Sequence, residues 1–533
     1  MELASFLQDV VVNNFTHDIA SLSVVLLVIM VLAHLVPYLS DPAGLRAYPG
    51  PSLAKLSKAW LARIAYHGRV NASVHEAHEK YGTFVRISPI EVSIVHPEAL
   101  HQIYGHTTGT TKSDLYSAFT QFGGTPSVFG TRDRTEHARK RKIMAHIFSL
   151  KSVVEFEPII HSYQRVLVQK WDRICEAGVR GNGGVEGSCV WRAGNERAWF
   201  DCMRWFNYLA FDIIGDLAFG SSFGMLAAVR DSTQIVTSQK AAMDAYGVQD
   251  AKLEYKTISA VEAINSASSI GVFLGILPLW LRPIVSRFFA AKMKARSSLG
   301  SMAATALLEG RDEQDRPLGK KELSAESLSL LVAGSDTTAN STGAITYFLA
   351  QNPNVQAKLQ EALDQVLGPP GGDSDNGDTA PYSKIKNIEY LQDVINEGLR
   401  LHSTVGIGLP RVVPEGGITV LGKTFASGTV ISCPLYALHR LPSVWGNDAD
   451  VFNPDRWSKG DRATMLKAFA PFSIGPRACL GRNLANMELL IFIATIFHRY
   501  DFVLGTPGQK LEVHDGFIRK PLGVSVGVKR RGA

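Results

Sequence analysis

The feature that most restricts this chain is one cysteine, Cys479, in the segment Phe472-Ser-Ile-Gly-Pro-Arg-Ala-Cys-Leu-Gly-Arg482. Glycines at 475 and 481 let the backbone approach a flat ligand closely. A helical pattern begins at Asn483, and a helix N-terminus favours a negatively charged sulfur. Arg477 can pair with an acidic group of the same ligand. An isolated cysteine is usually an inert buried residue, but these neighbours favour a thiolate that binds a haem iron.

The composition is that of a globular enzyme, because 46% of the 533 residues are hydrophobic and 20% are charged. The net charge is +6, with the basic residues spread among 49 acidic ones, so we predict no nucleic-acid partner. Five cysteines without a Cys-x-x-Cys pair argue against a disulfide framework or a zinc site. They indicate a reducing compartment for the main body.

An uncharged stretch from Ile19 to Leu39 predicts a transmembrane helix, since 21 helical residues span about 30 Å. A cleaved signal peptide would need basic residues before the apolar stretch, but here they follow it, from Arg46 onward. The positive-inside rule then predicts a single-pass anchor in the endoplasmic reticulum membrane. We expect residues 1–18 in the lumen, 19–39 as the anchor, 40–52 as a Pro-rich linker, and 53–533 as one cytosolic catalytic domain.

Apolar residues at helical spacing dominate the body, and one short stretch, 83–95, shows the alternation of strands. The predicted fold class is therefore mainly α with a small β region. Two stretches rich in Gly or Pro, 177–196 and 368–381, are predicted to be surface loops or disordered insertions. The predicted helices cover residues 206–219, 324–351, 355–367, 385–401 and 483–499.

One of these helices contains the run Ala333-Gly-Ser-Asp-Thr-Thr338, whose last five residues are poor helix formers. Their hydroxyl groups compete for the backbone carbonyls of the helix. Such a run within a strong helical pattern is either a costly accident or a functional distortion.

The segment around Cys479 matches the signature Phe-x-x-Gly-x-Arg-x-Cys-x-Gly at every fixed position. On this basis the chain resembles the cytochrome P-450 monooxygenases. The resemblance implies the fold of that family, a haem b whose iron is ligated by Cys479, and contacts between the haem and Phe472, Gly475 and Gly481. Nothing in the chain resembles a flavin or nicotinamide domain, so electrons are expected from NADPH through a separate cytochrome reductase.

The same resemblance gives the run at 333–338 a role beside the haem. Ala333 and Gly334 are expected to line the distal haem face, where O2 binds as co-substrate. Asp336 and Thr337 are expected to relay protons to the bound oxygen, because cleaving the O–O bond requires protons in a site that excludes water.

Haem propionates need cationic or hydrogen-bonding partners, and this sequence offers several. Basic residues from Arg139 to Lys142 could instead form a solvated face or a docking site for the reductase, and all three readings stay open. Glu397 and Arg400 share a helix face; the resemblance favours a buried structural pair closed by Arg456 over a solvated one. The candidate propionate partners are His137, Arg141, Arg411, His439 and Arg477.

Longer stretches resemble the fungal benzoate para-hydroxylases, which implies a small aromatic carboxylic acid as substrate. These stretches are 131–141, 205–220, 402–404 and 516–523. Two alternatives are a hydroxylase of a fungal secondary metabolite, terpenoid or polyketide, and a haem-thiolate isomerase. The intact Asp336 and Thr337 argue against the isomerase. Side chains that could either line the pocket or belong to the core are Tyr116, Phe119, Val332, Thr404 and Val405.

Overall fold

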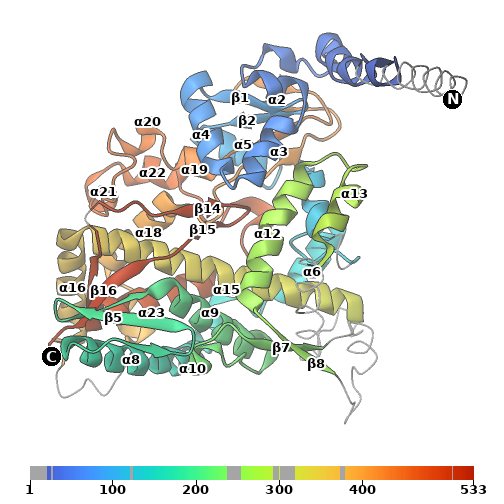
Figure 1. Ribbon diagram of the computed structural model, residues 1–533. Helices are drawn as coiled ribbons and strands as arrows, with labels where there is room; N and C mark the ends of the chain where they lie inside the picture. The colour runs from blue at the N-terminus through green and yellow to red at the C-terminus, as the bar shows by residue number, and fades with distance from the viewer. Residues whose placement is uncertain are drawn as a thin grey trace, which may run out of the picture.

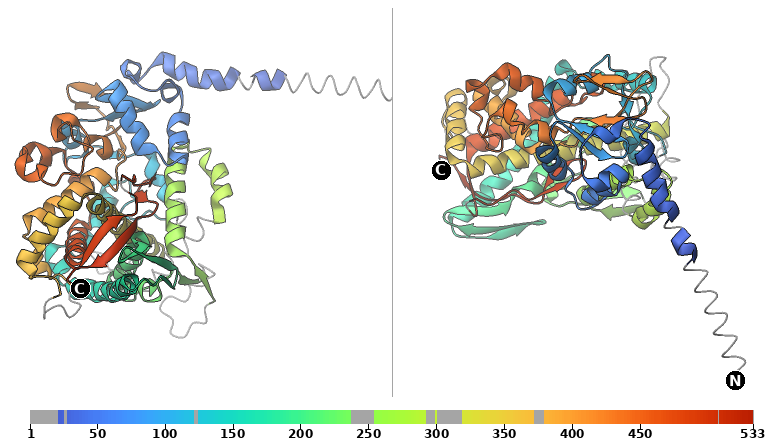
Figure 2. Two further views of the ribbon diagram at one scale, coloured as in Figure 1. Left: turned by 60° about the vertical axis from the view of Figure 1, so that its left-hand side comes forward. Right: turned by 90° about the horizontal axis from the view of Figure 1, so that it is seen from above.

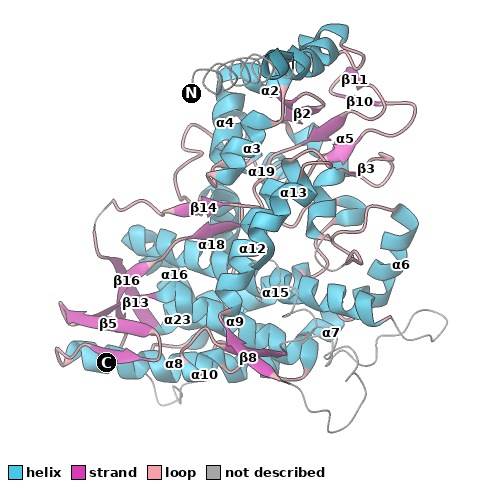
Figure 3. Cartoon of the chain, turned by 45° about the vertical axis from the view of Figure 1, so that its right-hand side comes forward, coloured by secondary structure: helices cyan, strands magenta, loops and turns pink. Residues whose placement is uncertain are grey.

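The structure is a computed structural model that describes residues 21–25, 28–120, 124–236, 254–291, 299, 319–371, 379–506 and 508–532. Helices make up most of the body, and small sheets lie among them (Figures 1 and 3). This arrangement confirms the predicted fold class, mainly α with a small β region.

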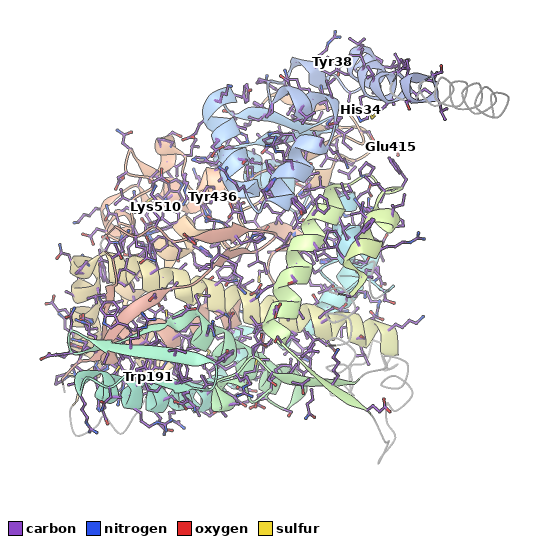
Figure 4. All side chains as sticks on the ribbon, viewed as in Figure 1. His34, Tyr38, Trp191, Glu415, Tyr436 and Lys510 are labelled. Atoms are coloured by element: carbon purple, nitrogen blue, oxygen red, sulfur yellow. The ribbon has the colours of Figure 1, made fainter. Side chains whose placement is uncertain are left out.

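An apolar helix over Ser21–Ser40 projects from the body (Figure 2), with a mean hydropathy of 2.5 and no buried residue in its most apolar stretch. By length and composition it is consistent with a membrane anchor. The segment that follows packs onto the body, because Leu45 and Tyr48 are buried and Tyr48 stacks on Phe425. Figure 4 labels Tyr38, near the end of this helix, and Trp191, at the opposite end of the molecule.

One sheet lies near the apolar N-terminal helix and pairs strands that are far apart in the sequence. Its order is β1-β2-β12-β9-β3, with β1 and β2 forming a hairpin in the predicted strand region. The register of β3 and β9 sets Lys112 opposite Arg411, which brings two basic residues to one edge of the sheet. The strands are β1 (Phe84–Ser88), β2 (Glu91–Ile94), β3 (Thr111–Lys112), β9 (Arg411–Val412) and β12 (Val430–Ser432).

A second five-stranded sheet, in the order β13-β16-β6-β5-β4, corrects the prediction of a surface loop over 177–196. Much of that stretch is a hairpin of β4 and β5, with Gly187 at its turn (φ 59°). The four glycines within 181–187 hide the alternation of a strand. Of the other predicted loop, residues 372–378 lie outside the described residues. The strands are β4 (Gly184–Glu186), β5 (Cys189–Gly194), β6 (Arg197–Asp201), β13 (Tyr500–Leu504) and β16 (Ser525–Arg530).

The long helix α15 (Lys320–Gln351) runs through the centre of the body and packs against α9, α18 and α23 (Figure 1). Glycines permit the close approach to α9: a Cβ on Gly334 would lie 2.7 Å from the side chain of Ile214. The five predicted helices are confirmed, although the predicted start at residue 385 falls in a separate short helix. Their observed bounds are α9 (Cys202–Phe219), α15, α16 (Pro353–Leu367), α18 (Glu389–His402) and α23 (Arg482–Arg499).

Shorter elements complete the described chain. The remaining helices are η1 (Leu45–Ala47), α2 (Ser52–Leu56), α3 (Ala59–Tyr66), α4 (Val70–Tyr81), α5 (Pro97–Tyr104), η2 (Asp114–Phe119), α6 (Arg134–Ala145), α7 (Leu150–Val154), α8 (Glu157–Val179), α10 (Met225–Ala228), α12 (Ala260–Ile276), α13 (Arg282–Ser286), η3 (Arg287–Phe289), α17 (Tyr382–Ile385), α19 (Leu435–Leu438), α20 (Pro442–Trp445), α21 (Arg456–Lys459), α22 (Arg462–Ala468) and η4 (Gly475–Arg477). The remaining strands are β7 (Thr233–Val236), β8 (Tyr255–Ile258), β10 (Ile418–Val420), β11 (Lys423–Phe425), β14 (Val513–Asp515) and β15 (Arg519–Pro521).

Candidate active site

The loop that carries Cys479 runs from η4 to the first turn of α23. Its backbone folds back on itself, since the N–H of Cys479 donates a 2.8 Å hydrogen bond to the carbonyl of Phe472. Gly475 has a φ of 72°, and a Cβ there would lie 1.9 Å from the carbonyl oxygen of Tyr104. Only glycine fits that position, so the loop is held against the end of α5. Around Gly481 a Cβ would meet only Phe148, at 4.0 Å.

The sulfur of Cys479 faces an internal space. Burial raises the pKa of its thiol, so protein atoms surround it, and yet Cys479 is the one accessible cysteine while the other four are buried. The N–H of Gly481, Arg141 and Arg482 act on that pKa in the opposite direction. Ala333 is likewise exposed although it lies within the central helix α15. Open surface therefore lies at the predicted iron ligand and on the predicted distal helix, as a flat cofactor between them requires.

Five basic side chains gather in one electrostatic cluster: Lys112, His137, Arg141, Arg411 and Arg477. Lys112, His137 and Arg411 are buried. Burial lowers the pKa of Lys112 well below its usual value, and the charges of Arg411, Arg477 and Arg141 lower it further. For His137, burial and the same surroundings lower the pKa to about 3. No carboxylate from the described chain forms an ion pair with any of the five, so the cluster fits a ligand that carries acidic groups.

Protein carbonyls already hold most of this cluster. Arg141 donates to the carbonyl of Ala478 at 2.7 Å, and Arg477 donates to Thr131 at 2.7 Å and to the two carbonyls that follow. The buried Lys112 donates to the carbonyl of Phe129. Arg141 and Arg477 therefore fasten α6 and its preceding loop to the cysteine loop, in addition to any role toward a ligand. Lys112 was missed because β3 is too short to show a sequence pattern.

His439 is placed differently from the other predicted propionate partners. It is fully buried, its Nδ1 lies 2.9 Å from the hydroxyl of Ser403, and its Nε2 accepts from the N–H of Ala470 at 3.3 Å. Both ring nitrogens are thus engaged by protein groups, which leaves neither of them free for a propionate in this structure.

The predicted relay residues occupy adjacent positions on α15 and have separate partners. Asp336 is buried, its carboxylate lies 3.8 Å from Nζ of Lys520 in β15, and Asn340 donates to it at 3.3 Å. Burial raises the pKa of Asp336, whereas Lys520 opposes that shift. Thr337 donates to the carbonyl of Ala333 at 2.7 Å. The helix is continuous through this run, and the hydroxyl groups of Ser335 and Thr337 bond back to carbonyls of the preceding turn without breaking it.

The residue after Thr337 contacts a buried carboxyl group that sequence reasoning missed. Thr338 of α15 donates a 2.9 Å hydrogen bond to Glu488 of α23. Glu488 is 3% exposed and burial raises its pKa to about 8. Its place in a strongly apolar helix was the one available signal.

Aromatic rings gather beside the basic cluster. Phe119, Phe129 and Phe517 make edge-to-face contacts at centroid distances of 5.2–5.4 Å. Tyr116 is fully buried, lies 5.6 Å from Phe129 and accepts a hydrogen bond from Arg411. Among the other predicted pocket residues, the hydroxyl of Thr404 pairs with that of Ser341 at 2.8 Å, Val332 packs on the large central core, and Val405 packs on a second core cluster.

The predicted structural ion pair is confirmed. Glu397 and Arg400 are fully buried and joined by two hydrogen bonds of 2.8 and 2.9 Å, and Arg456 donates to the same carboxylate at 2.8 Å. Trp457 and the backbone of Asn453 complete its partners. The site therefore rests on a satisfied buried network rather than a solvated pair.

Part of the basic run from Arg139 to Lys142 is committed to structure. Lys140 is buried and bonds to Glu322 and Glu326 of α15, while Arg139 pairs with Glu136 and Glu322. Neither residue is a free cation on a solvated face.

Comparison with known proteins assigns the family. The chain belongs to the cytochrome P-450 family, which it matches over residues 49–528, and it is a cytochrome P-450 monooxygenase. A benzoate 4-monooxygenase from Aspergillus niger is 39% identical, over 95% of this chain and 96% of the relative. A tryprostatin B 6-hydroxylase from Neosartorya fischeri is 28% identical over 86% of this chain and 76% of the relative. A pisatin demethylase from Fusarium vanettenii is 28% identical over 87% and 86%.

The family implies a haem with a thiolate ligand, and the residues present fit that group. The accessible sulfur of Cys479 faces an internal space, and the buried basic cluster can bind acidic groups such as propionates. The family also implies a small-molecule substrate and a reductase partner.

Proposed function

We propose that this monooxygenase hydroxylates benzoate, or a closely related aromatic acid, at the ring position para to the carboxylate. The observation that carries the proposal is the 39% identity to a benzoate 4-monooxygenase over nearly the whole of both chains. The aromatic cluster of Tyr116, Phe119, Phe129 and Phe517 supports it, because edge-to-face contacts suit a small flat ring.

A second candidate is hydroxylation of a larger secondary metabolite of terpenoid or polyketide type. It is supported by the relatives at 28% identity, whose names specify tryprostatin B and pisatin. Benzoate is favoured over it because the identity is higher and the coverage is nearly complete.

We assign the iron ligand to Cys479 and the binding of the propionates to members of the basic cluster, chiefly Arg411 and His137. The haem, when bound, supplies the redox-active iron that reduces dioxygen with electrons from NADPH. Gly475 and the Phe472 carbonyl fix the loop so that the sulfur keeps its place. Ala333 keeps the facing surface of α15 low enough for a flat group.

We assign proton delivery to Asp336 and Thr337. The Asp336 carboxylate takes up a proton and passes it on, and its buried position keeps bulk water away. The Thr337 hydroxyl, held by the Ala333 carbonyl, presents its oxygen toward the open surface of α15 as acceptor. Lys520 and Asn340 hold the Asp336 carboxylate in place between transfers.

The apolar helix Ser21–Ser40 supports a location at a membrane. We infer that it spans the endoplasmic reticulum membrane once, with residues 1–18 in the lumen and the catalytic domain, residues 53–533, in the cytosol beside an NADPH-cytochrome reductase. The uncharged span and the basic residues after it support this orientation.

The proposal is tested with the full-length holoenzyme in lipid nanodiscs. Benzoate is expected to displace the water on the iron, seen as a shift in the haem absorbance spectrum, while a terpene of similar mass is not. With reductase and NADPH, 4-hydroxybenzoate should form. A spectral shift with terpenes but not with benzoate would favour the second candidate, and product without reductase would favour an isomerase.

A further inference from the structure

The loop between η2 and α6 contains Phe129, one ring of the aromatic cluster described above. This ring lies 5.6 Å from Tyr116, 5.4 Å from Phe119 and 5.2 Å from Phe517, measured between ring centroids. It therefore contacts all three other members of the cluster. Residues 124–133 of the loop contain no helix or strand. The position of Phe129 therefore depends on the side chains that hold the backbone of the loop.

A carboxylate in the central helix α15 holds this backbone. Both carboxylate oxygens of Glu326 accept from the N–H of Val128, at 2.8 and 3.0 Å. Glu326 is 5% exposed, and a hydrogen bond to a charged group is stronger than one between neutral groups. Because Phe129 is the next residue, the bond fixes the backbone directly before the ring.

Two buried lysines hold the same loop through its carbonyl groups. Nζ of Lys140 in α6 donates to the carbonyl of Pro126 at 2.7 Å and to Glu326 at 3.2 Å. Lys112 in β3 donates to the carbonyl of Phe129 itself. Charged side chains from three elements thus bind a loop that has no regular structure of its own.

The bond to the loop, and not the contact with Lys140, distinguishes Glu326 from its neighbour in the same ion network. Glu322, one turn earlier on α15, lies 3.0 Å from Nζ of Lys140 and also pairs with Arg139. Within the described chain Glu322 makes no hydrogen bond to the loop. Burial raises the pKa of Glu326, whereas the N–H of Val128 and the charge of Lys140 oppose that shift. Without Glu326, Lys140 would keep a counterion, but Val128 would lose its acceptor.

We propose that Glu326 is a positioning residue for the monooxygenase reaction, which fixes Phe129 through the backbone of Val128 and thereby makes the site selective for a small flat ring. Glu326 contacts neither the haem nor the substrate and acts through the aromatic cluster. A buried charged group is a costly way to add stability, but its directed bonds select one conformation of an irregular loop. The role rests on the proposed function only in placing the aromatic cluster beside the haem.

Two ligands that bind the haem iron through a ring nitrogen test this role without the natural substrate. The dissociation constants of imidazole and 4-phenylimidazole are measured from the haem spectrum of the full-length holoenzyme in nanodiscs. Wild-type protein is expected to bind 4-phenylimidazole at least about tenfold more tightly, because its phenyl ring contacts the aromatic cluster. The ratio of the two constants is the phenyl preference, and the affinity for imidazole alone reports on the iron.

Two substitutions of Glu326 separate the bond from the charge. Glu326→Asp keeps the charge but is one methylene shorter, so it no longer reaches Val128, and the phenyl preference should fall at least about fivefold. Glu326→Gln keeps the length and an acceptor for the N–H, and should retain the phenyl preference within about twofold. Imidazole should bind equally well to both variants. If Glu326 served only as a counterion of Lys140, the order would be reversed, with the larger loss in Glu326→Gln.

Glu322→Asp is the matched control, because it makes the same shortening in the same ion network without touching the loop. Its phenyl preference should equal that of the wild type. Phe129→Ala should remove the preference, and adding Glu326→Asp to it should cause no further loss, because the two residues act as one unit. Hydrogen exchange of the wild type is a second measurement, in which the Val128 amide should exchange at least about 100-fold more slowly than an open amide.

The outcomes for the positioning role and for the proposed substrate can be told apart. The role would be overturned by a wild type without phenyl preference, by an equal preference in the wild type and Glu326→Asp, or by a larger loss in Glu326→Gln, whatever the enzyme does with benzoate. The expected order of variants, together with no product from benzoate, would support the role and contradict the proposed substrate. If Glu326→Asp does not fold, the exchange rate of the Val128 amide in the wild type decides, and rapid exchange would overturn the role.

Discussion

Thr338 in the central helix α15 donates a 2.9 Å hydrogen bond to Glu488, a carboxyl group buried in α23. The bond joins the helix that follows Cys479 to the residue beside Thr337. The two sides of the proposed haem site are therefore coupled through one titratable group, and its protonation state matters to the stability of the site.

The stability of the protein is expected to fall between pH 5 and pH 8 because of Glu488. Burial raises its pKa to about 8 in the folded state, so the unfolded chain loses this proton at lower pH than the folded chain does. The contribution of Glu488 to the free energy of unfolding is fully present below its pKa in the unfolded chain, and it is lost progressively as pH rises through this interval. Glu488→Gln removes the titration but keeps an acceptor for Thr338. The free energy of unfolding of this variant, relative to the wild type, should therefore be higher at pH 8 than at pH 5 by on the order of 2 kcal/mol.

The measurement is the temperature at which the carbon monoxide complex of the reduced enzyme loses its red-shifted absorbance, recorded at pH 5.5 and pH 8.5. The difference between the two temperatures should be smaller in Glu488→Gln than in the wild type. Thr338→Val serves as a second variant, and leaves the carboxyl unpaired at both pH values, at a cost of about 1–3 kcal/mol. Equal pH dependence in wild type and Glu488→Gln would contradict the argument.

Thr337→Ala should separate oxygen consumption from product formation. The variant lacks the hydroxyl proposed to pass protons, and general acid catalysis contributes about 100-fold or more, so the product formed per NADPH is expected to fall at least about tenfold. Thr342→Ala is the matched control, since Thr342 lies on the same helix and makes the same kind of bond, to the Thr338 carbonyl at 2.9 Å. A similar loss of coupling in both variants would assign the effect to the helix, not to the relay.

Cys479→Ser should abolish the red-shifted carbon monoxide band, because an alcohol does not replace a thiolate on the iron. The matched control is Cys189→Ser, which alters a buried cysteine of the outer hairpin. The visible spectrum and the ratio of haem to protein report on both variants. A normal band in Cys479→Ser would remove the basis for the whole assignment of the haem site.

Glu397→Gln is expected to destabilise the protein by about 3–5 kcal/mol, the usual cost of removing one partner from a buried ion pair. It leaves the fully buried Arg400 with its charge uncompensated and leaves Arg456 with only the half-exposed Asp448 as its ion-pair partner. Asp455→Asn is the control, because Asp455 pairs with half-exposed or exposed lysines nearby, and its loss should cost less than about 1 kcal/mol. Haem content after expression and thermal stability are the readouts, and equal losses would argue against the buried network.

Local patterns explain why part of this protein could be predicted from its sequence. The loop around Cys479 and the run with Asp336 and Thr337 are each contiguous, so their residues could be recognised without knowing the fold. The helices at α15 and α23 follow from apolar spacing over many turns. The hairpin of β4 and β5 escaped prediction because its glycines interrupt a short alternation.

The partners of the site residues could not be predicted, because they come from distant parts of the chain. Lys520 reaches Asp336 from a hairpin near the C-terminus, and Glu488 reaches Thr338 from the helix after the cysteine loop. Lys112 joins the basic cluster only through the pairing of β3 with β9. Each of these contacts depends on tertiary packing, which leaves no periodic signal in the sequence.

Gly475→Ala should cost more stability than the same change at another glycine of similar backbone conformation. At Gly475 a Cβ would stand 1.9 Å from the carbonyl oxygen of Tyr104, whereas at Gly422, with a φ of 74°, nothing lies within 4 Å. Gly422→Ala therefore reports the strain of a positive φ alone, about 1 kcal/mol. The excess loss in Gly475→Ala reports the clash of the added Cβ with the Tyr104 carbonyl, which would push the cysteine loop away from α5. Both variants are measured by thermal unfolding and by the carbon monoxide band. The band should weaken only in Gly475→Ala, because the sulfur shifts with its loop. Equal behaviour of the two variants would show that the loop is free to move.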